Sequence, residues 1–115
     1  MLVAMDVSLT LSGTIPVFRL SGRLDATSSP LLEERIKPHL EEQGKKLVFD
    51  CDGLTYVSSA GLRVFLTCQR QLGAHGGGVA FASLSTPVRD LFHLAGLQDL
   101  FVIEANAEAA AARLG

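Results

Sequence analysis

The chain has 115 residues, enough for one domain with a hydrophobic core but too few for an enzyme with a cleft between two domains. Apolar residues make up 48% and charged residues 19% of the sequence, which is typical of a folded globular protein and excludes a mainly disordered one. Ten basic and twelve acidic side chains leave a formal charge of −2 without a basic stripe interleaved with aromatic residues, so nucleic acid is not an expected partner.

A β-hairpin is the first element predicted along the chain. Apolar and polar residues alternate in VSLTLSG, residues 7–13, and again in TIPVFRLSG, residues 14–22. Alternation of this kind is typical of strands with one buried face, and Gly13 between the two runs suits a tight turn. We therefore expect two antiparallel strands over residues 7–22.

The first helix is predicted within residues 26–44. We expect Ser29 to cap its N-terminus, because a serine oxygen there accepts a hydrogen bond from a free backbone N–H group. Pro30 suits the first helical position, and Glu33 and Glu34 are expected to complement the positive end of the helix dipole. Several signals therefore mark the start of this helix.

The later part of the same helix carries a conflicting signal. Pro38 removes one backbone hydrogen bond, so it should bend or break the helix unless tertiary contacts compensate. Gly44 marks the expected end of the helix. The residues predicted to face the core are Leu32, Ile36 and Leu40.

Strands and helices alternate through the rest of the chain. KLVFDC, residues 46–51, and VAFAS, residues 79–83, are predicted to be short strands covered on both faces. A third helix is predicted over residues 86–96, a short strand over 100–104 and an alanine-rich final helix over 105–115. The helix between the two buried strands is expected to have its apolar side at Leu62, Phe65, Leu66, Cys68 and Leu72.

This order of elements predicts one α/β domain over residues 1–115. Its mixed, mostly parallel sheet begins with an antiparallel hairpin, and about four helices pack on it. In such sheets the functional loops follow the carboxyl ends of strands, where helices begin and expose free N–H groups. Two polar segments occupy such places, YVSSAG (residues 56–61) and GRLDATSS (residues 22–29).

The hydroxyls of Ser58 and Ser59 admit three interpretations at the start of the second helix. They can simply cap the helix. They can accept a phosphate, which the helix N-terminus would favour and which would add up to about two negative charges to the surface. They can also act as nucleophiles, although Val57 stands where a serine hydrolase elbow needs glycine, and HGGG, residues 75–78, follows the serines instead of preceding them. A small serine hydrolase is therefore the less favoured alternative.

The second polar segment contains Asp25, three residues after Gly22. An aspartate after a strand is suited to an Asx-type turn that helps the following helix to start. It is equally suited to contact with a partner protein. The sequence leaves both interpretations open.

No metal, cofactor or membrane segment is predicted. The two cysteines lack the spacing of a zinc or redox pair and are expected to be buried free thiols, Cys51 in a strand and Cys68 on the apolar side of a helix. The histidines, which fit no ligand spacing, are His39, His75 and His93. No apolar run approaches the roughly 18 residues of a membrane span and no leader-like segment opens the chain, so we expect a cytoplasmic protein without membrane insertion.

Three segments in this order resemble the STAS family, whose best-known members are bacterial anti-sigma factor antagonists. LSGRLDATSSPLLEERI resembles the G-x-L-D segment that follows the family's second strand. LVFDCDGLTYVSSAGLRVFL resembles its D-S-S-G-L motif with the preceding strand, and PVRDLFHLAGL resembles its third helix. The resemblance extends over nearly the whole chain, and the family fold that it implies is the mixed sheet with helices expected above.

The resemblance implies a function in binding rather than catalysis. In the family's antagonists, the unphosphorylated protein binds a serine kinase that doubles as an anti-sigma factor, and so frees the sigma factor. Phosphorylation of the serine just before the motif glycine breaks that complex, and a phosphatase restores it. The chemistry belongs to the partner, so this chain is not expected to be an enzyme.

The sequence departs from the family pattern at the phosphoacceptor. Aligned on Gly61, the family's D-S-S is Ser58, Ser59 and Ala60, so alanine stands at the usual acceptor position. Ser59 is then the first candidate for a displaced acceptor and Ser58 the second, while a module that is never phosphorylated is a third alternative. The resemblance implies a partner-binding surface made of Gly22, Asp25, Ser58, Ser59, Ala60, Gly61 and Arg63.

The sequence thus predicts a regulatory protein that binds an anti-sigma factor or serine kinase of the same pathway and is switched by serine phosphorylation. Within the same fold, the alternative is a STAS subunit of a lipid-transport or signalling complex that works without phosphorylation.

Overall fold

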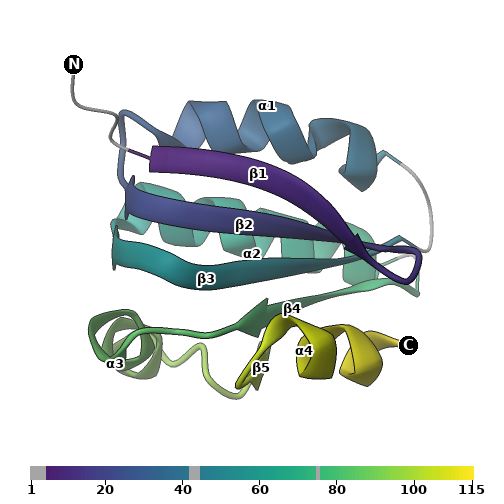
Figure 1. Ribbon diagram of the computed structural model, residues 1–115. Helices are drawn as coiled ribbons and strands as arrows, with labels where there is room; N and C mark the ends of the chain where they lie inside the picture. The colour runs from purple at the N-terminus through teal and green to yellow at the C-terminus, as the bar shows by residue number, and fades with distance from the viewer. Residues whose placement is uncertain (1–4, 42–44, 75) are drawn as a thin grey trace.

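The computed structural model of the chain describes residues 5–41, 45–74 and 76–115, which form a sheet with helices on both faces (Figure 1). The described helices are α1 (Ser29–Leu40), α2 (Ser59–Gly73), α3 (Thr86–Leu94) and α4 (Ala107–Leu114). The strands are β1 (Met5–Ser12), β2 (Ile15–Leu24), β3 (Lys46–Val57), β4 (Gly78–Ala82) and β5 (Val102–Glu104). The predicted order of elements is confirmed.

The five strands lie in the sheet in the same order as in the sequence. β1 pairs antiparallel with β2, which confirms the predicted hairpin, and Gly13 has the positive φ of 62° that its turn requires. β2, β3, β4 and β5 are parallel neighbours. The predicted mixed, mostly parallel sheet is therefore confirmed, and the carboxyl ends of β2, β3 and β4 lie at one end of it.

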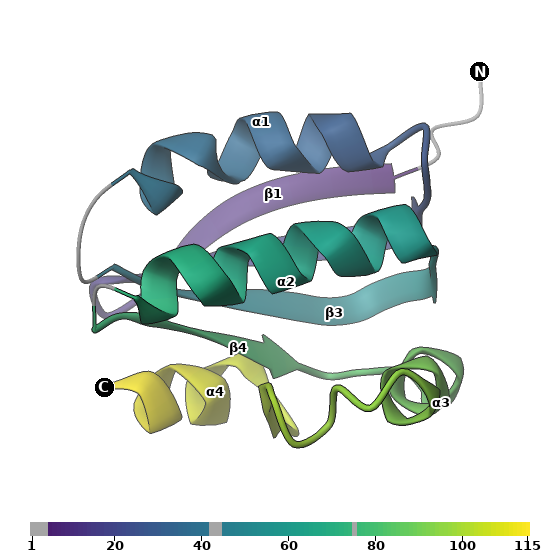
Figure 2. The ribbon, with the colours of Figure 1, turned by 180° about the vertical axis from the view of Figure 1, so that it is seen from behind.

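Helices cover the two faces of the sheet unequally. α1 and α2 lie side by side across one face (Figure 2), and their apolar sides pack on a core that contains five fully buried phenylalanines. On the opposite face, α4 packs its small residues Ala110 and Ala111 against β3 and β4 (Figure 1). The phenylalanines of the main core are Phe18, Phe49, Phe65, Phe81 and Phe92.

Strand β3 is longer than the sequence indicated, because it continues through Asp52 and Gly53 to Val57. The register between β2 and β3 shifts between Arg19 and Ser21, so the strand bulges instead of ending. Gly53 permits this, because a Cβ atom there would lie 2.6 Å from the Cβ of Ser21. The extension carries Tyr56 and Val57 to the same end of the sheet as the end of β2.

The start of α1 differs from the expectation in two respects. Ser28, not Ser29, is the N-cap residue, and its side chain makes no capping hydrogen bond. The Ser29 hydroxyl instead donates to the carbonyl oxygen of Asp25 at 2.6 Å. The first helical turn contains no acidic residue, so Glu33 and Glu34 lie too far along the helix to complement its dipole.

Pro38 does not break α1. The helix runs through Pro38 to Leu40, and Pro38 lies in its last turn. Buried Leu32 and Ile36 hold the helix on the core, which supports it where the proline removes one hydrogen bond. The predicted end at Gly44 lies outside the described residues.

Both thiols are buried and free, as predicted. Burial raises the pKa of the Cys68 thiol to about 12. Burial also raises the pKa of the Cys51 thiol far above its ordinary value, with the charge of Asp50 acting in the same direction. Both thiols therefore stay protonated near neutral pH and act as small apolar side chains.

In the part of the chain that the structure describes, no helix has the length and apolar character needed to cross a membrane.

Candidate functional site

The two polar segments singled out by the sequence lie together at the carboxyl end of the sheet. Leu24 and Val57 pair across the parallel strands β2 and β3, so the loops that follow these strands leave the sheet side by side. The backbone N–H of Ser58 donates to the carbonyl oxygen of Leu24 at 2.8 Å. This hydrogen bond ties the loop before α2 directly to the loop that contains Asp25.

The two serines of the second loop have different environments. Ser58 is the N-cap of α2, is partly buried, and its Oγ accepts a hydrogen bond from the N–H of Gly61 at 3.3 Å. Ser59 is the first residue of the helix, and its side chain is exposed. Capping therefore accounts for the hydroxyl of Ser58, and the hydroxyl of Ser59 is the one presented to solvent.

Gly61 is buried and lets the start of α2 approach the sheet closely. A Cβ atom at this position would lie 2.7 Å from Cγ of Leu24 and 2.9 Å from Cγ1 of Val57. These two side chains end β2 and β3, the strands that precede the two polar loops. The glycine therefore fixes the distance between the helix N-terminus and the Asp25 loop.

Replacing Gly61 with alanine is expected to destabilise the fold by about 1–3 kcal/mol, because the methyl group would overpack a closed contact. The matched control is Gly73→Ala at the other end of α2, where a Cβ atom would meet nothing within 4 Å. That change should leave stability unchanged or raise it by up to about 1 kcal/mol. Urea titration of both variants measures the difference, and equal stabilities would show that the contact at Gly61 is not closely packed.

Asp25 forms the Asx-type turn that the sequence allowed. Its Oδ1 accepts hydrogen bonds from the N–H groups of Thr27 at 3.0 Å and Ser28 at 3.1 Å, and the Ser28 hydroxyl lies 3.2 Å away. The Ser28 hydroxyl in turn accepts from the N–H of Asp25 at 2.9 Å and donates to the Arg23 carbonyl oxygen at 2.8 Å. The carboxylate thus holds together the turn that leads into α1.

These hydrogen bonds lower the pKa of the Asp25 carboxyl below its ordinary value. The N–H of Ser28 contributes most, while the partial desolvation of the carboxyl acts in the opposite direction. The Ser28 hydroxyl, the N–H of Thr27 and the charge of Arg23 all act to lower the pKa further. The side chain is therefore a carboxylate at neutral pH, with a negative charge at the edge of the site.

Gly22 shapes the strand just before this turn. It has a positive φ of 98°, and the register between β2 and β3 shifts a second time between Gly22 and Arg23. The hydroxyl of Thr55 donates to the Gly22 carbonyl oxygen at 3.0 Å. The irregular backbone at Gly22 therefore sets how the end of β2 meets the end of β3.

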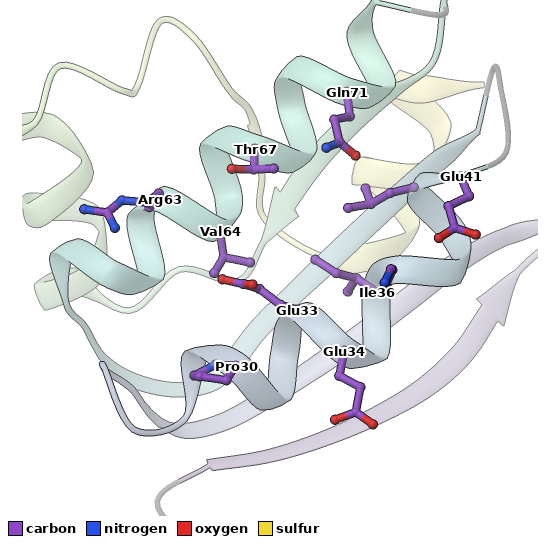
Figure 3. Close-up of a pocket in the computed structure, with 11 residues that line it drawn as sticks. Pro30, Glu33, Glu34, Ile36, Glu41, Arg63, Val64, Thr67 and Gln71 are labelled. Carbon is purple, nitrogen blue, oxygen red and sulfur yellow. The ribbon is translucent and has the colours of Figure 1, made fainter.

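Arg63 lies one turn along α2 from Ser59 and is exposed. It stands at one end of a groove of about 660 Å³ between α1 and α2, where its guanidinium points away from the other lining side chains (Figure 3). In the same view, Glu33 reaches from α1 toward Val64 on α2. The predicted site thus borders this groove through Arg63 alone, because the remaining predicted residues do not line it.

The sequence did not single out the third loop at this end of the sheet, between β4 and α3. Ser83 there adopts a φ of 59°, which is uncommon outside glycine, and its hydroxyl donates to the carbonyl oxygen of Ala105. The Ser85 hydroxyl donates to the Leu54 carbonyl oxygen at 3.3 Å. A serine in a left-handed conformation has no sequence pattern that would have revealed it.

The side chains of Arg23 and Tyr56 were also missed. The guanidinium carbon of Arg23 lies 4.2 Å from the centre of the Tyr56 ring, and each residue belongs to one of the two polar segments, near the end of its strand. The sequence carries an arginine and a tyrosine near the ends of two strands, but it does not give the register that brings them together.

Within the described part of the chain, His, Cys, Asp and Glu side chains form no group of three that could hold a metal ion. His75, which belongs to the HGGG segment, lies outside the described residues.

A comparison with known protein families identifies the family of this chain. Residues 6–110 match the family model described as the STAS domain. The chain belongs to the STAS domain family. The resemblance inferred from the three sequence segments is thereby confirmed.

Similar proteins within the STAS family are named as anti-sigma factor antagonists. The anti-sigma-B factor antagonist of Bacillus subtilis is 34% identical over 89 residues, which cover 77% of this chain and 81% of that protein. An anti-sigma factor antagonist from Mycobacterium paratuberculosis superposes with a TM-score of 0.85 at 22% identity, over 96% of this chain and 93% of that one. The Bacillus protein SpoIIAA, solved unphosphorylated and phosphorylated, is also similar in fold. Its unphosphorylated form has a TM-score of 0.80 at 24% identity, over 94% of this chain and 95% of that one.

Proposed function

We propose that this chain is an anti-sigma factor antagonist, which binds an anti-sigma factor with serine kinase activity and is released from it by phosphorylation. The observation that carries the proposal is the joining of the Asp25 loop and the Ser58–Ser59 loop into one exposed polar surface by the hydrogen bond from Ser58 to Leu24. The names of the similar proteins support the same function. This chain supplies a docking surface and a phosphoacceptor, and the kinase supplies the catalysis.

Ser59 is the proposed acceptor. Its hydroxyl is exposed at the first position of α2, whereas Ser58 is partly buried and its Oγ already accepts a capping hydrogen bond. The kinase would transfer the γ-phosphoryl group of ATP to Oγ of Ser59, releasing the hydroxyl proton and ADP. The phosphate would then lie beside the free N–H groups of the first helical turn, where a negative charge is favoured.

Phosphorylation changes the surface far more than the fold. A phosphoserine adds about −1.5 to −2 charge units at neutral pH. The carboxylate of Asp25 already contributes a negative charge to the same surface. A partner that docks on this surface when it carries a single carboxylate therefore meets strong additional negative charge after phosphorylation, and the complex separates. Removal of the phosphate by a phosphatase would restore binding.

The experiment that tests the proposal incubates the protein with ATP and each purified anti-sigma factor kinase encoded in the source genome. Mass spectrometry should then find one phosphate on Ser59. Ser59→Ala should abolish the modification, whereas Ser58→Ala should still be modified because it removes only the cap. A phosphate on another residue would contradict the assignment of Ser59. A kinase can also bind this chain without phosphorylating it, although the same kinase phosphorylates its known substrate. That result would favour the alternative, a STAS subunit that is never phosphorylated.

A further inference from the structure

Tyr56 is an aromatic side chain left on the surface of a protein that buries its other aromatic residues. The chain contains one tyrosine, six phenylalanines and no tryptophan. Five phenylalanines are fully buried and the sixth, Phe101, is 5% exposed, whereas Tyr56 is 40% exposed. Tyrosine and arginine dominate the residues that contribute most to protein interfaces, so an exposed tyrosine beside an arginine requires an explanation.

Tyr56 is held in place by Arg23. The two residues pair in register across β2 and β3, and the guanidinium carbon lies 4.2 Å from the ring centre, which is the geometry of a cation–π contact. The hydroxyl of Thr55 donates to the carbonyl oxygen of Gly22, and this hydrogen bond joins β3 to β2 directly beside the pair. The contact restricts the side chains of this pair, which we call the platform, before any partner arrives, and this reduces the entropy lost on binding.

The guanidinium of Arg23 keeps its hydrogen-bonding capacity. A cation–π contact acts through the charge of the guanidinium, so its N–H groups stay available as hydrogen-bond donors. No described residue forms an ion pair with Arg23, in contrast to Arg19 on the same strand, which lies within ion-pair distance of Asp50 and Asp52. A carboxylate from another molecule can therefore accept hydrogen bonds from Arg23.

The platform is continuous with the proposed docking surface. Arg23 lies two residues before Asp25 along the chain, and its charge lowers the pKa of the Asp25 carboxyl. Tyr56 lies two residues before Ser58, whose N–H is bonded to Leu24. A partner that covers both polar loops therefore reaches the platform without a gap.

We propose that Arg23 and Tyr56 form the anchor of the partner-binding surface, and that they receive an acidic side chain of the partner protein. The partner's carboxylate pairs with the guanidinium of Arg23, and an adjacent apolar group of the partner covers the exposed part of the Tyr56 ring. This inference rests on the proposed function, because the partner is the anti-sigma factor kinase. It adds an arginine–tyrosine pair to a surface whose charged and polar side chains were so far the two serines, Asp25 and Arg63.

The test measures the affinity of the full chain for the purified kinase that binds it. Tyr56→Ala and Arg23→Ala should each lower the affinity at least about tenfold, the loss expected for anchor residues. Tyr56→Phe should bind like the parent protein, because it keeps the ring. Arg19→Ala is the matched control, since it removes the same charge four residues earlier on β2 and should not change the affinity.

Two further readouts follow binding at the platform directly. The single tyrosine allows 3-fluorotyrosine to be incorporated at one position, so one ¹⁹F resonance should shift when the kinase binds. The affinity of Arg23→Ala should also depend less steeply on salt than that of Arg19→Ala, because Arg23 pairs with the partner and Arg19 does not. Thermal melting of each variant checks that the fold is kept.

The outcomes separate this inference from the proposed function. If Ser59→Asp loses binding while Tyr56→Ala binds like the parent protein, the anchor is wrong and the proposed function stands. An unchanged ¹⁹F resonance at saturating kinase would overturn the anchor in the same way. If no kinase of the source organism binds the parent protein, the proposed function fails and the anchor fails with it.

Discussion

The Ser59→Asp variant is expected to lose most of its affinity for the kinase partner while it keeps its fold. Ser59 is exposed at the first position of α2, where the helix dipole tolerates or favours a carboxylate. The free energy of unfolding should therefore change by less than about 1 kcal/mol. In the complex, the new charge would be buried near the Asp25 carboxylate and should cost several kcal/mol of binding free energy, in the range of roughly 2–5 kcal/mol.

Isothermal titration calorimetry measures the loss of binding, and thermal melting measures the stability. The matched control is Ser59→Asn, which has the shape of aspartate without its charge and should bind nearly as well as the parent protein. Equal losses for the two variants would show that side-chain size, not charge, disrupts the interface. Full-strength binding of Ser59→Asp would remove this loop from the interface altogether.

Local patterns predicted that the two polar loops lie at the same end of the sheet, whereas the resemblance to the STAS family implied that β2 and β3 are neighbours. Buried strands that alternate with amphipathic helices favour parallel neighbours, and this places the loops after β2 and β3 at one end of the sheet. The structure confirms that consequence through the pairing of Leu24 with Val57. The three segments that resemble the STAS family supported the same arrangement. The first contains the Asp25 loop, the second contains the Ser58–Ser59 loop, and the third contains α3.

Two of the details that were wrong have different causes, one being the pairing of distant strands and the other the geometry of a local turn. The sequence predicted a strand that ends at Cys51, yet pairing with β2 carries β3 through a bulge to Val57. Ser29 was predicted as a cap from its type and position. The structure instead gives the N-cap position to Ser28, and the Asp25 carboxylate organises the turn.

The contact between Arg23 and Tyr56 could not be predicted, because it depends on the register between β2 and β3. The bulges at the ends of β2 and β3 decide which residues face each other, and the register shifts twice over this short distance. A sequence pattern gives the alternation along one strand but not the offset between two. Exposed residues that meet across such a shift are found only once the register is known.

The structure also changes what is expected of Asp25. Because its carboxylate accepts hydrogen bonds from Thr27 and Ser28, Asp25→Ala should both loosen the start of α1 and weaken partner binding. Ser29 cannot compensate as a cap, because its hydroxyl donates to the carbonyl oxygen of Asp25. Binding and stability should therefore fall together in the alanine variant, and a second substitution is needed to separate them.

Asp25→Asn provides that separation, because an amide oxygen can still accept the N–H of Thr27 and Ser28 while the charge is lost. It should melt close to the parent protein, yet bind the kinase on the order of tenfold more weakly if a partner cation pairs with the carboxylate. The lowered pKa of the Asp25 carboxyl gives a further check, since stability from its charged form is present above the ordinary aspartate pKa and is lost as the pH falls. The difference in melting temperature between Asp25→Ala and the parent protein should accordingly shrink on acidification. If Asp25→Asn binds the kinase as well as the parent protein does, Asp25 serves the turn alone and contributes no charge to the interface.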